Sequence, residues 1–286
     1  ATTTNSSTDS GTSTVTGTPK AIAIAQPAMP SPAVKQAQEV KRMEGHIDWV
    51  KALTFSKDSH HGLSGGSDHT VRLWDLDIGQ EIRHFDGHMD DVNTISMSPK
   101  GDMVASGGDD QTVRVWNSND STLLHTLKGH RNIVTCVSFS PDGSKILSGS
   151  YDRTIRYWNL SDRTVIHSLN GHTGTVRCVA LTPDGARALS GGDDGTIRIW
   201  DLTTGNQIRV LAGHSDKVLC LAVSPNGGKA LSGSRDLSVR LWDLNNGQQQ
   251  LKLDGHKDWV LKVAFVPGSD RAVSGSLDKS VRKWDL

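Results

Sequence analysis

Three side-chain types that form hydrolase triads, His, Ser and Asp, recur in this sequence at fixed offsets, and a Trp follows each set. In such a triad the Asp orients the His, and the His takes the proton of the Ser hydroxyl, which becomes the nucleophile. Consecutive sets lie 42 residues apart, as His46 and His88 do. The six sets are His46, Ser64, Asp68 and Trp74; His88, Ser106, Asp110 and Trp116; His130, Ser148, Asp152 and Trp158; His172, Ser190, Asp194 and Trp200; His214, Ser232, Asp236 and Trp242; and His256, Ser274, Asp278 and Trp284.

The sixfold repetition of these sets argues against catalysis. An enzyme needs one active site, whereas a repeated scaffold needs the same support in every unit, and function has to be argued from a site. No unit carries a unique insertion or an unrepeated acid–base pair. We therefore predict that the chain is not an enzyme, that it has no catalytic residue and that it uses no cofactor.

The three cysteines also follow the repeat. Cys136, Cys178 and Cys220 lie 42 residues apart and occupy one equivalent strand position in three consecutive units. Stacked sheets are about 10 Å apart, which is too far for a disulfide. We expect buried free thiols, which are compatible with a reducing compartment and favour the cytoplasm. Export stays open, because the sequence begins with Ala rather than Met.

Two further clusters resemble metal sites only at first sight. His60 and His61 are adjacent in an irregular turn without a third ligand, and exposed loop residues are the better interpretation. The Asp doublets at 109–110 and 193–194 each include one Asp of a repeated set. The sequence therefore predicts no metal site.

The elements that must position the repeated sets are short strands. After each Gly-His pair comes an apolar run such as "VTCVSF", followed by a turn such as "SPDG", in which Pro and Gly favour chain reversal. Runs such as "KILSGS" and "TIRYW" follow, and a fourth run such as "TLLHTL" leads to the next Gly-His. The first run is apolar on both sides, which indicates a sheet packed between two neighbouring sheets.

The Gly-His and the Trp-Asp or Trp-Asn pairs keep their spacing in all six units without insertion or deletion. A fixed period of this length is typical of propeller blades. On these motifs residues 38–286 resemble the WD40-repeat family. The resemblance implies an all-β fold, a β-propeller of four-stranded antiparallel blades. It also implies a structural staple in each set, in which Asp binds His, His binds Ser, and Ser binds the indole N–H. The repeats are 45–86, 87–128, 129–170, 171–212, 213–254 and 255–286.

The number of strands predicts how the propeller closes. Six three-strand sets follow the six Gly-His pairs, and "QEVKRM" at 38–43 precedes the first pair as "QEIRHF" precedes the second. The chain ends at "WDL" without an outer strand for the last set, so strand 38–43 is expected to pair with the last blade and close a ring of six. The alternative is a seven-bladed parent with one unit missing. We expect a monomeric propeller.

Residues 1–37 have a different composition, rich in Ser and Thr and then in Ala and Pro, which predicts a disordered linker. Lys+Arg and Asp+Glu are equal at 31 each, so no net field favours nucleic acid as a partner. The sequence contains no run of about 20 apolar residues, so we predict no membrane span.

Because the units are so regular, the residues that the repeat leaves free are the informative ones. The loop before the first strand and the turn between the second and third strands lie on one face, which propellers commonly use for partners. In each unit one loop residue stands three positions after the His, and one turn residue stands just before the Asp of the set. The loop residues are Trp49, Asp91, Ile133, Thr175, Lys217 and Trp259, and the turn residues are Ser67, Asp109, Tyr151, Asp193, Arg235 and Leu277.

These twelve residues mix aromatic, acidic, basic and apolar side chains, as a recognition surface does. All of them except Asp91 and Thr175 are predicted partner-binding residues. We expect a non-catalytic scaffold that binds a protein or peptide, and the resemblance to regular WD repeats of bacterial regulatory proteins implies a regulatory module of a larger protein. The alternatives are a small-molecule-binding or catalytic propeller that uses its central channel, and a purely structural assembly unit. In a closed ring of six, Trp49 and Trp259 would share one aromatic patch.

Overall fold

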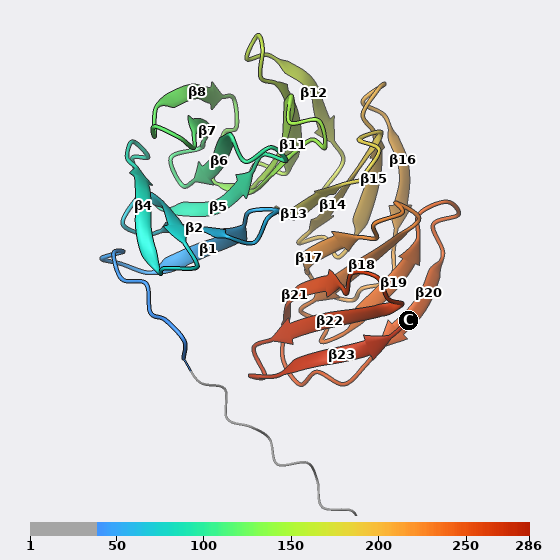
Figure 1. Cartoon of the computed structure of the whole chain (residues 1–286). Helices are drawn as coiled ribbons and strands as arrows, with labels where there is room; N and C mark the ends of the chain where they lie inside the picture. Colours follow the sequence, from blue (N-terminus) through green and yellow to red (C-terminus); the bar gives the residue numbers. More distant parts are fainter. Residues whose placement is uncertain (1–38) are drawn as a thin grey trace, which may run out of the picture. The chain divides into compact units, whose positions relative to one another are not determined.

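Each repeat of the sequence folds into one small antiparallel sheet, because its four β-prone runs are separated by turns. The computed structural model describes residues 39–286, and these contain strands and turns but no helix. The predicted linker at 1–37 lies outside the described residues. We number the sheets blade 1 to blade 6 in chain order (Figure 1).

The strands occupy equivalent positions in every blade. The first strands are β1 (Val50–Phe55), β5 (Val92–Met97), β9 (Val134–Phe139), β13 (Val176–Leu181), β17 (Val218–Val223) and β21 (Val260–Phe265). The second strands are β2 (His61–Gly66), β6 (Met103–Gly108), β10 (Lys145–Ser150), β14 (Arg187–Gly192), β18 (Lys229–Ser234) and β22 (Arg271–Ser276). The third strands are β3 (Val71–Asp75), β7 (Thr112–Asn117), β11 (Thr154–Asn159), β15 (Ile197–Asp201), β19 (Val239–Asp243) and β23 (Val281–Asp285). The fourth strands are β4 (Gln80–Phe85), β8 (Leu123–Lys128), β12 (Val165–Asn170), β16 (Gln207–Leu211) and β20 (Gln249–Leu253).

Blades 1 to 5 are four-stranded, in the order first, second, third and fourth strand, and blade 6 holds only β21, β22 and β23. The first strand carries an irregularity near its start, with a register shift between Val50 and Ala52 in blade 1 and at the equivalent place in blades 2, 4, 5 and 6. Such a bulge re-aims the residue that it leaves unpaired. That residue, Lys51 in blade 1 and Arg177 in blade 4, lines the central cavity described below.

The turn between the first and second strands owes its shape to its glycine. Gly143 has a φ of 73°, and its N–H donates to the Ser140 carbonyl oxygen at 2.8 Å. Blade 1 lacks the Pro-Gly sequence, and Ser59 takes the left-handed conformation there with a φ of 63°. Glycine tolerates this region without the steric cost that a Cβ brings.

The hydrophobic core lies between neighbouring blades. One apolar cluster joins Leu63, Val71 and Phe85 of blade 1 to Val92 and Trp116 of blade 2. Blades approach closely because the second strand presents a glycine to the first residue of the next blade's first strand. A Cβ placed on Gly65 would lie 2.8 Å from Val92 Cγ1. The same approach recurs at Gly107, Gly149, Gly191 and Gly233, with 2.5 to 2.7 Å to Val134, Val176, Val218 and Val260.

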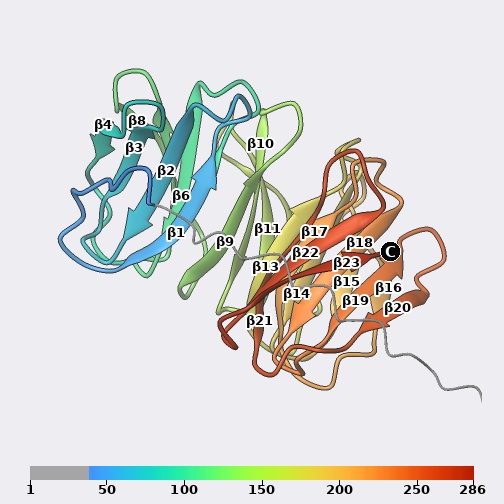
Figure 2. The ribbon, with the colours of Figure 1, turned by 60° about the horizontal axis from the view of Figure 1, so that its bottom comes forward.

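The two end faces lack this contact. We call the side of blade 1 that carries Val50, Leu53 and Phe55, and the side of blade 6 that carries Gly275 and Val281, the end faces. Val50 is 49% exposed and Val281 is 79% exposed, whereas the equivalent valines Val92 and Val71 are fully buried. No heavy atom lies within 4 Å of a Cβ placed on Gly275. Figures 1 and 2 show β1 and β21 at the two ends of the series of first strands.

The closing strand expected at 38–43 is not formed in this structure. Residues 39–46 carry no strand, and β23 has no outer neighbour in the described part of the chain. The reason lies in the contacts of this segment, because Lys41 Nζ donates to the backbone oxygen of Asp77, in the β3–β4 turn of blade 1, at 2.7 Å. The structure therefore shows six blades of a propeller, and it does not show closure of the ring.

Candidate functional site: the loop face of the blades

The four side chains of each predicted staple lie within hydrogen-bond distance of one another. His Nδ1 lies 2.7 to 2.9 Å from Asp Oδ2 in the six blades. His Nε2 lies 2.6 to 2.8 Å from Ser Oγ. The indole N–H of the Trp donates to the same Ser Oγ at 2.7 to 2.9 Å.

The staple resembles a catalytic triad in geometry, but its hydroxyl is closed to a substrate. Because the carboxylate accepts from Nδ1–H, Nε2 accepts from the Ser hydroxyl, and the Ser oxygen in turn accepts from the indole. Ser106, Ser148, Ser190 and Ser232 are fully buried, so their oxygens have no access for an acyl group. The arrangement holds three elements of a blade together.

The sequence analysis missed a fifth member of the staple. Two residues after the Asp, a hydroxyl donates to its other oxygen at 2.6 to 2.9 Å, from Thr70, Thr112, Thr154, Thr196, Ser238 and Ser280. The signal in the sequence was the recurrence of Thr or Ser at this place in all six units.

These bonds stabilise the charged form of the buried carboxylate. Burial by itself would raise the pKa of Asp194, but hydrogen bonds from His172 and Thr196 lower that pKa well below its ordinary value. The same balance holds for Asp110, Asp152 and Asp236. Burial lowers the pKa of His214, against the opposing effect of Asp236. The staple of blade 5 is thus a neutral imidazole on an ionised carboxylate.

The staple brings the predicted recognition residues to one end of each blade, which we call the loop face. In every blade the backbone N–H of the turn residue donates to the carbonyl oxygen of the loop residue at 2.8 to 3.0 Å, as Ser67 does to Trp49 and Leu277 does to Trp259. The remaining pairs are Asp109 with Asp91, Tyr151 with Ile133, Asp193 with Thr175, and Arg235 with Lys217.

Across the interface between two blades, the turn residue faces the loop residue of the following blade. Ser67 Oγ donates to Asp91 Oδ2 at 3.2 Å. Lys217 Nζ donates to Asp193 Oδ2 at 2.9 Å. The guanidinium of Arg235 lies 3.8 Å from the ring centroid of Trp259, which is a close cation–π contact.

Blades 3 to 5 carry the most extensive network on this face, and its centre is Arg177. The Nε and Nη2 groups of Arg177 donate to the two oxygens of Asp193 at 2.7 and 2.9 Å, and its Nη1 donates to Tyr151 Oη at 2.9 Å. These partners raise the pKa of Arg177, and the pKa of Asp193 is lowered because hydrogen bonds from Arg177 and Lys217 outweigh its burial. The sequence analysis did not select Arg177, although it is the only Arg at its strand position among the six units.

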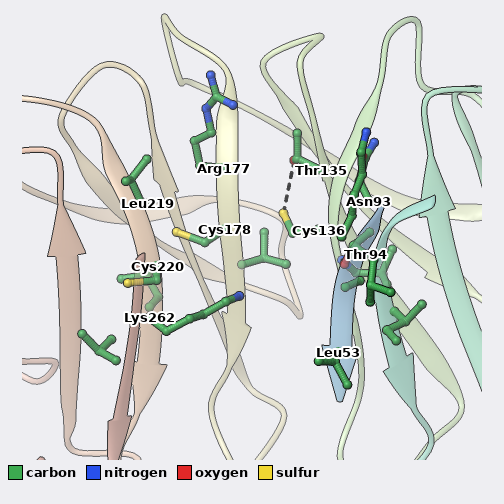
Figure 3. Close-up of a pocket in the computed structure, with 18 residues that line it drawn as sticks. Leu53, Asn93, Thr94, Thr135, Cys136, Arg177, Cys178, Leu219, Cys220 and Lys262 are labelled. Carbon is green, nitrogen blue, oxygen red and sulfur yellow. Dashed lines mark hydrogen bonds between the residues drawn. The ribbon is translucent and has the colours of Figure 1, made fainter. Parts of the chain in front are cut away.

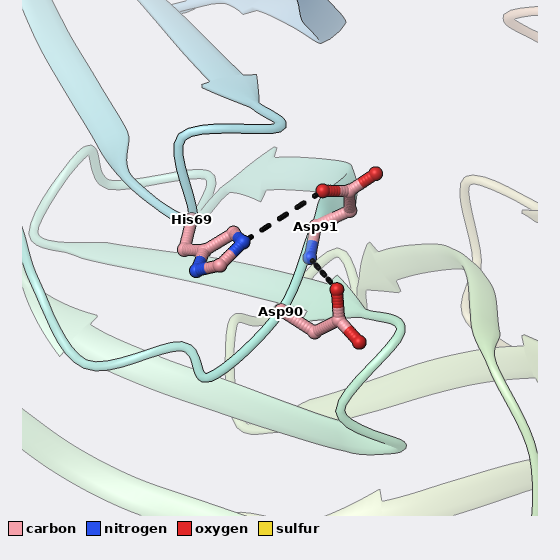
Figure 4. Close-up of side chains that lie close together, drawn as sticks. All are labelled: His69, Asp90 and Asp91. Atoms are coloured by element: carbon pink, nitrogen blue, oxygen red, sulfur yellow. Dashed lines mark hydrogen bonds and ion pairs between the residues drawn. The ribbon is translucent and has the colours of Figure 1, made fainter. Parts of the chain in front are cut away.

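A different cluster lies on blades 1 and 2, where His69, Asp90 and Asp91 bring one potential ligand atom each within 4.8 Å of one another (Figure 4). His69 Nε2 is 3.9 Å from Asp91 Oδ1. The other oxygen of Asp91 accepts from Lys51 and from Ser67, and these hydrogen bonds lower the pKa of Asp91. The negative charge of Asp91 is therefore already balanced by the ammonium group of Lys51.

The predicted residues that keep free surface are mainly apolar. Trp49 is 79% exposed, Leu277 is 46% exposed, and Trp259 is 37% exposed beneath Arg235. Ile133 and Asp109 are half-buried, and Asp109 accepts from Asn93 Nδ2 at 2.5 Å. Trp49 and Trp259 share no ring contact within residues 39–286, and their joint patch stays a prediction that depends on ring closure.

The first strands of all six blades surround a central cavity of about 370 Å³ (Figure 3). Its charged lining side chains are Lys51, Arg177 and Lys262, and the three cysteines lie on its wall. The thiols are free, and burial raises the pKa of Cys136 to about 11 and that of Cys220 to about 12. They are neutral at physiological pH and are poor nucleophiles.

Repeated four-stranded blades that are held by His-Ser-Asp-Trp staples and present loops on one face define a β-propeller scaffold. The family model of the WD domain, G-beta repeat, matches residues 37–75, 79–117, 121–159, 163–201, 205–243 and 247–285. The chain therefore belongs to the WD40-repeat family. No curated protein matches the chain with significant similarity. Within the described residues, no helix has the length and apolar character to span a membrane.

Proposed function

We propose that the chain is a non-catalytic interaction module that binds a protein or peptide on its loop face. Proteins of the WD40-repeat family generally serve as interaction scaffolds. The observation that carries the proposal is the contrast among tryptophans. Trp116, Trp158, Trp200 and Trp242 are 1% exposed, whereas Trp49 places its ring in solvent at 79% exposure on the loop face. Exposed aromatic side chains are costly in water and are typical of binding hot spots.

The loop face has one part whose polar groups bind one another and a second part whose apolar side chains are exposed. In the first part, Tyr151, Asp193 and Lys217 form hydrogen bonds with one another or with Arg177. Trp49, Trp259 and Leu277 keep apolar surface exposed, although one face of the Trp259 ring is covered by Arg235. We expect these three residues to supply most of the binding free energy, and the network to position them.

The double substitution Trp49→Ala with Trp259→Ala tests this proposal. Hot-spot aromatics contribute about 2 kcal/mol or more each, so the loss of both, about 4 kcal/mol, should weaken capture of the partner by roughly a thousandfold. The control is Ile78→Ala, which removes an apolar side chain of intermediate exposure (56%) from the β3–β4 turn, at the end of blade 1 opposite the loop face.

Capture is measured together with a thermal melt of each variant. Lost capture with an unchanged melt supports the loop-face site, provided that Ile78→Ala retains capture. Unchanged capture by the double variant contradicts the proposal, and a collapsed melt would show that the two tryptophans are core residues instead.

The absence of catalysis forms part of the proposal, and the buried hydroxyl of every interior staple supports it. We further propose that the module regulates, or reports to, another part of a larger protein, to which residues 1–37 connect it. The strict regularity of the repeats supports a scaffold whose specificity lies in its loops.

A further inference from the structure

One residue breaks the repeat inside the central cavity. The third position of the first strand is small in five blades, and its residues are Ala52, Thr94, Cys136, Cys178 and Cys220; in blade 6 it is Lys262. The small side chains fit a tight place, since a Cβ on Gly149 would lie 2.7 Å from Cys136 Sγ, and a Cβ on Gly191 would lie 2.8 Å from Cys178 Sγ. In blade 6 the place beside Gly275 is open, with no heavy atom within 4 Å of an added Cβ, and Lys262 is exposed there.

Lys262 extends into the cavity instead. Figure 3 shows its side chain reaching from β21 with the ammonium group pointing into the space beside the cysteines. The positive charge is near enough to favour the thiolate forms of Cys136, Cys178 and Cys220, although burial keeps the pKa of each thiol raised. No hydrogen bond or ion pair joins Lys262 to any other of residues 39–286.

The ionic side chains that line the cavity all have the same sign. Lys51, Arg177 and Lys262 are cations, and no Asp or Glu lines the cavity. Lys51 and Arg177 are neutralised by Asp91 and Asp193 from the loop face, while Lys262 has no such counter-charge. The neutral thiols cannot supply one either. A cavity with one sign of charge and low-dielectric walls concentrates ions of the opposite sign.

We propose that the central cavity binds a compact anion, a carboxylate or phosphate group, against the ammonium of Lys262. A space of about 370 Å³ is large enough for an oxyanion or a small polyacid. Lys51 and Arg177 also line the cavity, but their charges are compensated by Asp91 and Asp193, so the proposal rests on Lys262. The anionic group is either that of a free small molecule or an acidic side chain that a partner on the loop face inserts into the channel, and the chemistry at Lys262 is the same in both cases.

The test uses the full chain and titrates it at constant ionic strength with inorganic phosphate, with citrate and with a hexaglutamate peptide. Binding is followed by calorimetry and by the shift of the thermal melt. The main variant is Lys262→Cys, which installs the residue that the repeat itself uses at 136, 178 and 220 and is therefore expected to fold. Lys262→Gln keeps a polar side chain, one methylene shorter, without the charge. Lys257→Ala removes an exposed lysine outside the cavity as the control.

We expect at least one probe to bind the wild type, with a Kd at least tenfold weaker in both Lys262 variants and unchanged in Lys257→Ala. Binding of phosphate or citrate with loss in the Lys262 variants assigns the site to a free anion. Binding of hexaglutamate alone, lost both in the Lys262 variants and in the Trp49→Ala, Trp259→Ala variant, assigns it to an acidic side chain of a partner. Equal binding by wild type and the Lys262 variants, or no binding of any probe to the wild type, overturns the proposal and leaves the loop-face function untouched.

Discussion

The five interfaces between blades and the two end faces are built from the same repeat, yet their residues differ sharply in burial. At an interior interface the first valine of a blade is fully buried against the glycine of the preceding blade, as Val218 is against Gly191. At the ends the equivalent residues are Val50, which is half exposed, and Gly275, where an added Cβ would have no heavy atom within 4 Å. Each repeat therefore encodes two halves of an interface, and only a neighbouring blade completes either half.

The loop face shows the same contrast. Interior turn and loop residues pair across blades, as Asp193 pairs with Lys217 and Arg235 with Trp259. The unpaired members at the two ends are Leu277 and Trp49, an apolar and an aromatic side chain that would suit each other in a closed ring. Both are exposed in this structure. The contrast is tested by making the same substitution at an interior and at an end position.

The largest difference is expected at the close-approach glycines. Gly191→Ala places a Cβ 2.6 Å from Val218 Cγ1 and 2.8 Å from Cys178 Sγ, which should cost about 3 kcal/mol of unfolding free energy through overpacking. Gly275→Ala meets open space and should change stability by less than about 0.5 kcal/mol. Urea unfolding of the two variants measures the difference. An equal loss in both would show that β1 packs on β22 in solution, and hence that the ring is closed.

The next largest effect concerns the staple. Ser190→Ala removes a fully buried hydroxyl and leaves the Trp200 indole N–H and His172 Nε2 without partners, so we expect a loss of about 2 kcal/mol. The same change at Ser274 of blade 6 should cost less, because Trp284 is only half-buried and water can reach its N–H. Ser168→Ala on the exposed strand β12 is the control and should be neutral. A larger loss at Ser274 than at Ser190 would contradict the contrast between interior and end.

The sequence could predict the blades because their information is local and repeated six times. The spacing of Gly-His, Ser, Asp and Trp is enough to define strands, turns and staple, as the hydrogen bonds of blade 4 illustrate. Closure could not be predicted in the same way, because it depends on whether residues from opposite ends of the chain meet. Segment 38–43 resembles an outer strand in sequence, but here Lys41 binds the β3–β4 turn of blade 1.

The sequence could predict which face of the blades carries the candidate site, but it could not predict most of the contacts between the residues of that face. Turn and loop residues could be assigned to one end of the blades from the strand order alone. That Tyr151, Asp193 and Lys217 would engage one another through Arg177 could not be seen, because these contacts join different repeats. Lys262 was overlooked for a related reason, since its departure from the repeat matters only once six first strands surround one cavity.

Acid should destabilise the protein in two stages, first through His214 of blade 5 and then through the staple carboxylates. The pKa of His214 is lower in the folded than in the unfolded chain, so the unfolded state takes up a proton first, and stability is lost as the pH falls through about 6.5. The carboxylates of Asp194 and Asp278 have lowered pKa values in the folded chain, so their contribution is present above the ordinary Asp pKa of 3.8 and is lost as the pH falls further. Each interior group adds up to about 1.4 kcal/mol per pH unit to the slope. Urea unfolding from pH 8 to pH 3 checks this, and stability that rises on acidification would refute it.

The smallest effect is expected at the left-handed turn position that follows each staple Asp. The position after each staple Asp is left-handed, with φ of 70° at Arg153 in blade 3, 72° at Gly195 in blade 4 and 68° at Lys279 in blade 6. Only blade 4 uses glycine there, so Arg153→Gly and Lys279→Gly should each stabilise the protein by about 1 kcal/mol by relieving the steric cost of a Cβ. Both side chains are exposed, and neither donates a hydrogen bond within residues 39–286. The gain should be present in both blades and somewhat larger in blade 3, because in an interior blade the next blade lies close, as the His214 carbonyl oxygen does at 3.2 Å from a Cβ on Gly195. A gain in blade 3 that is absent in blade 6, measured by the same unfolding curves, would show that the open end changes the turns of its blade as well as its packing.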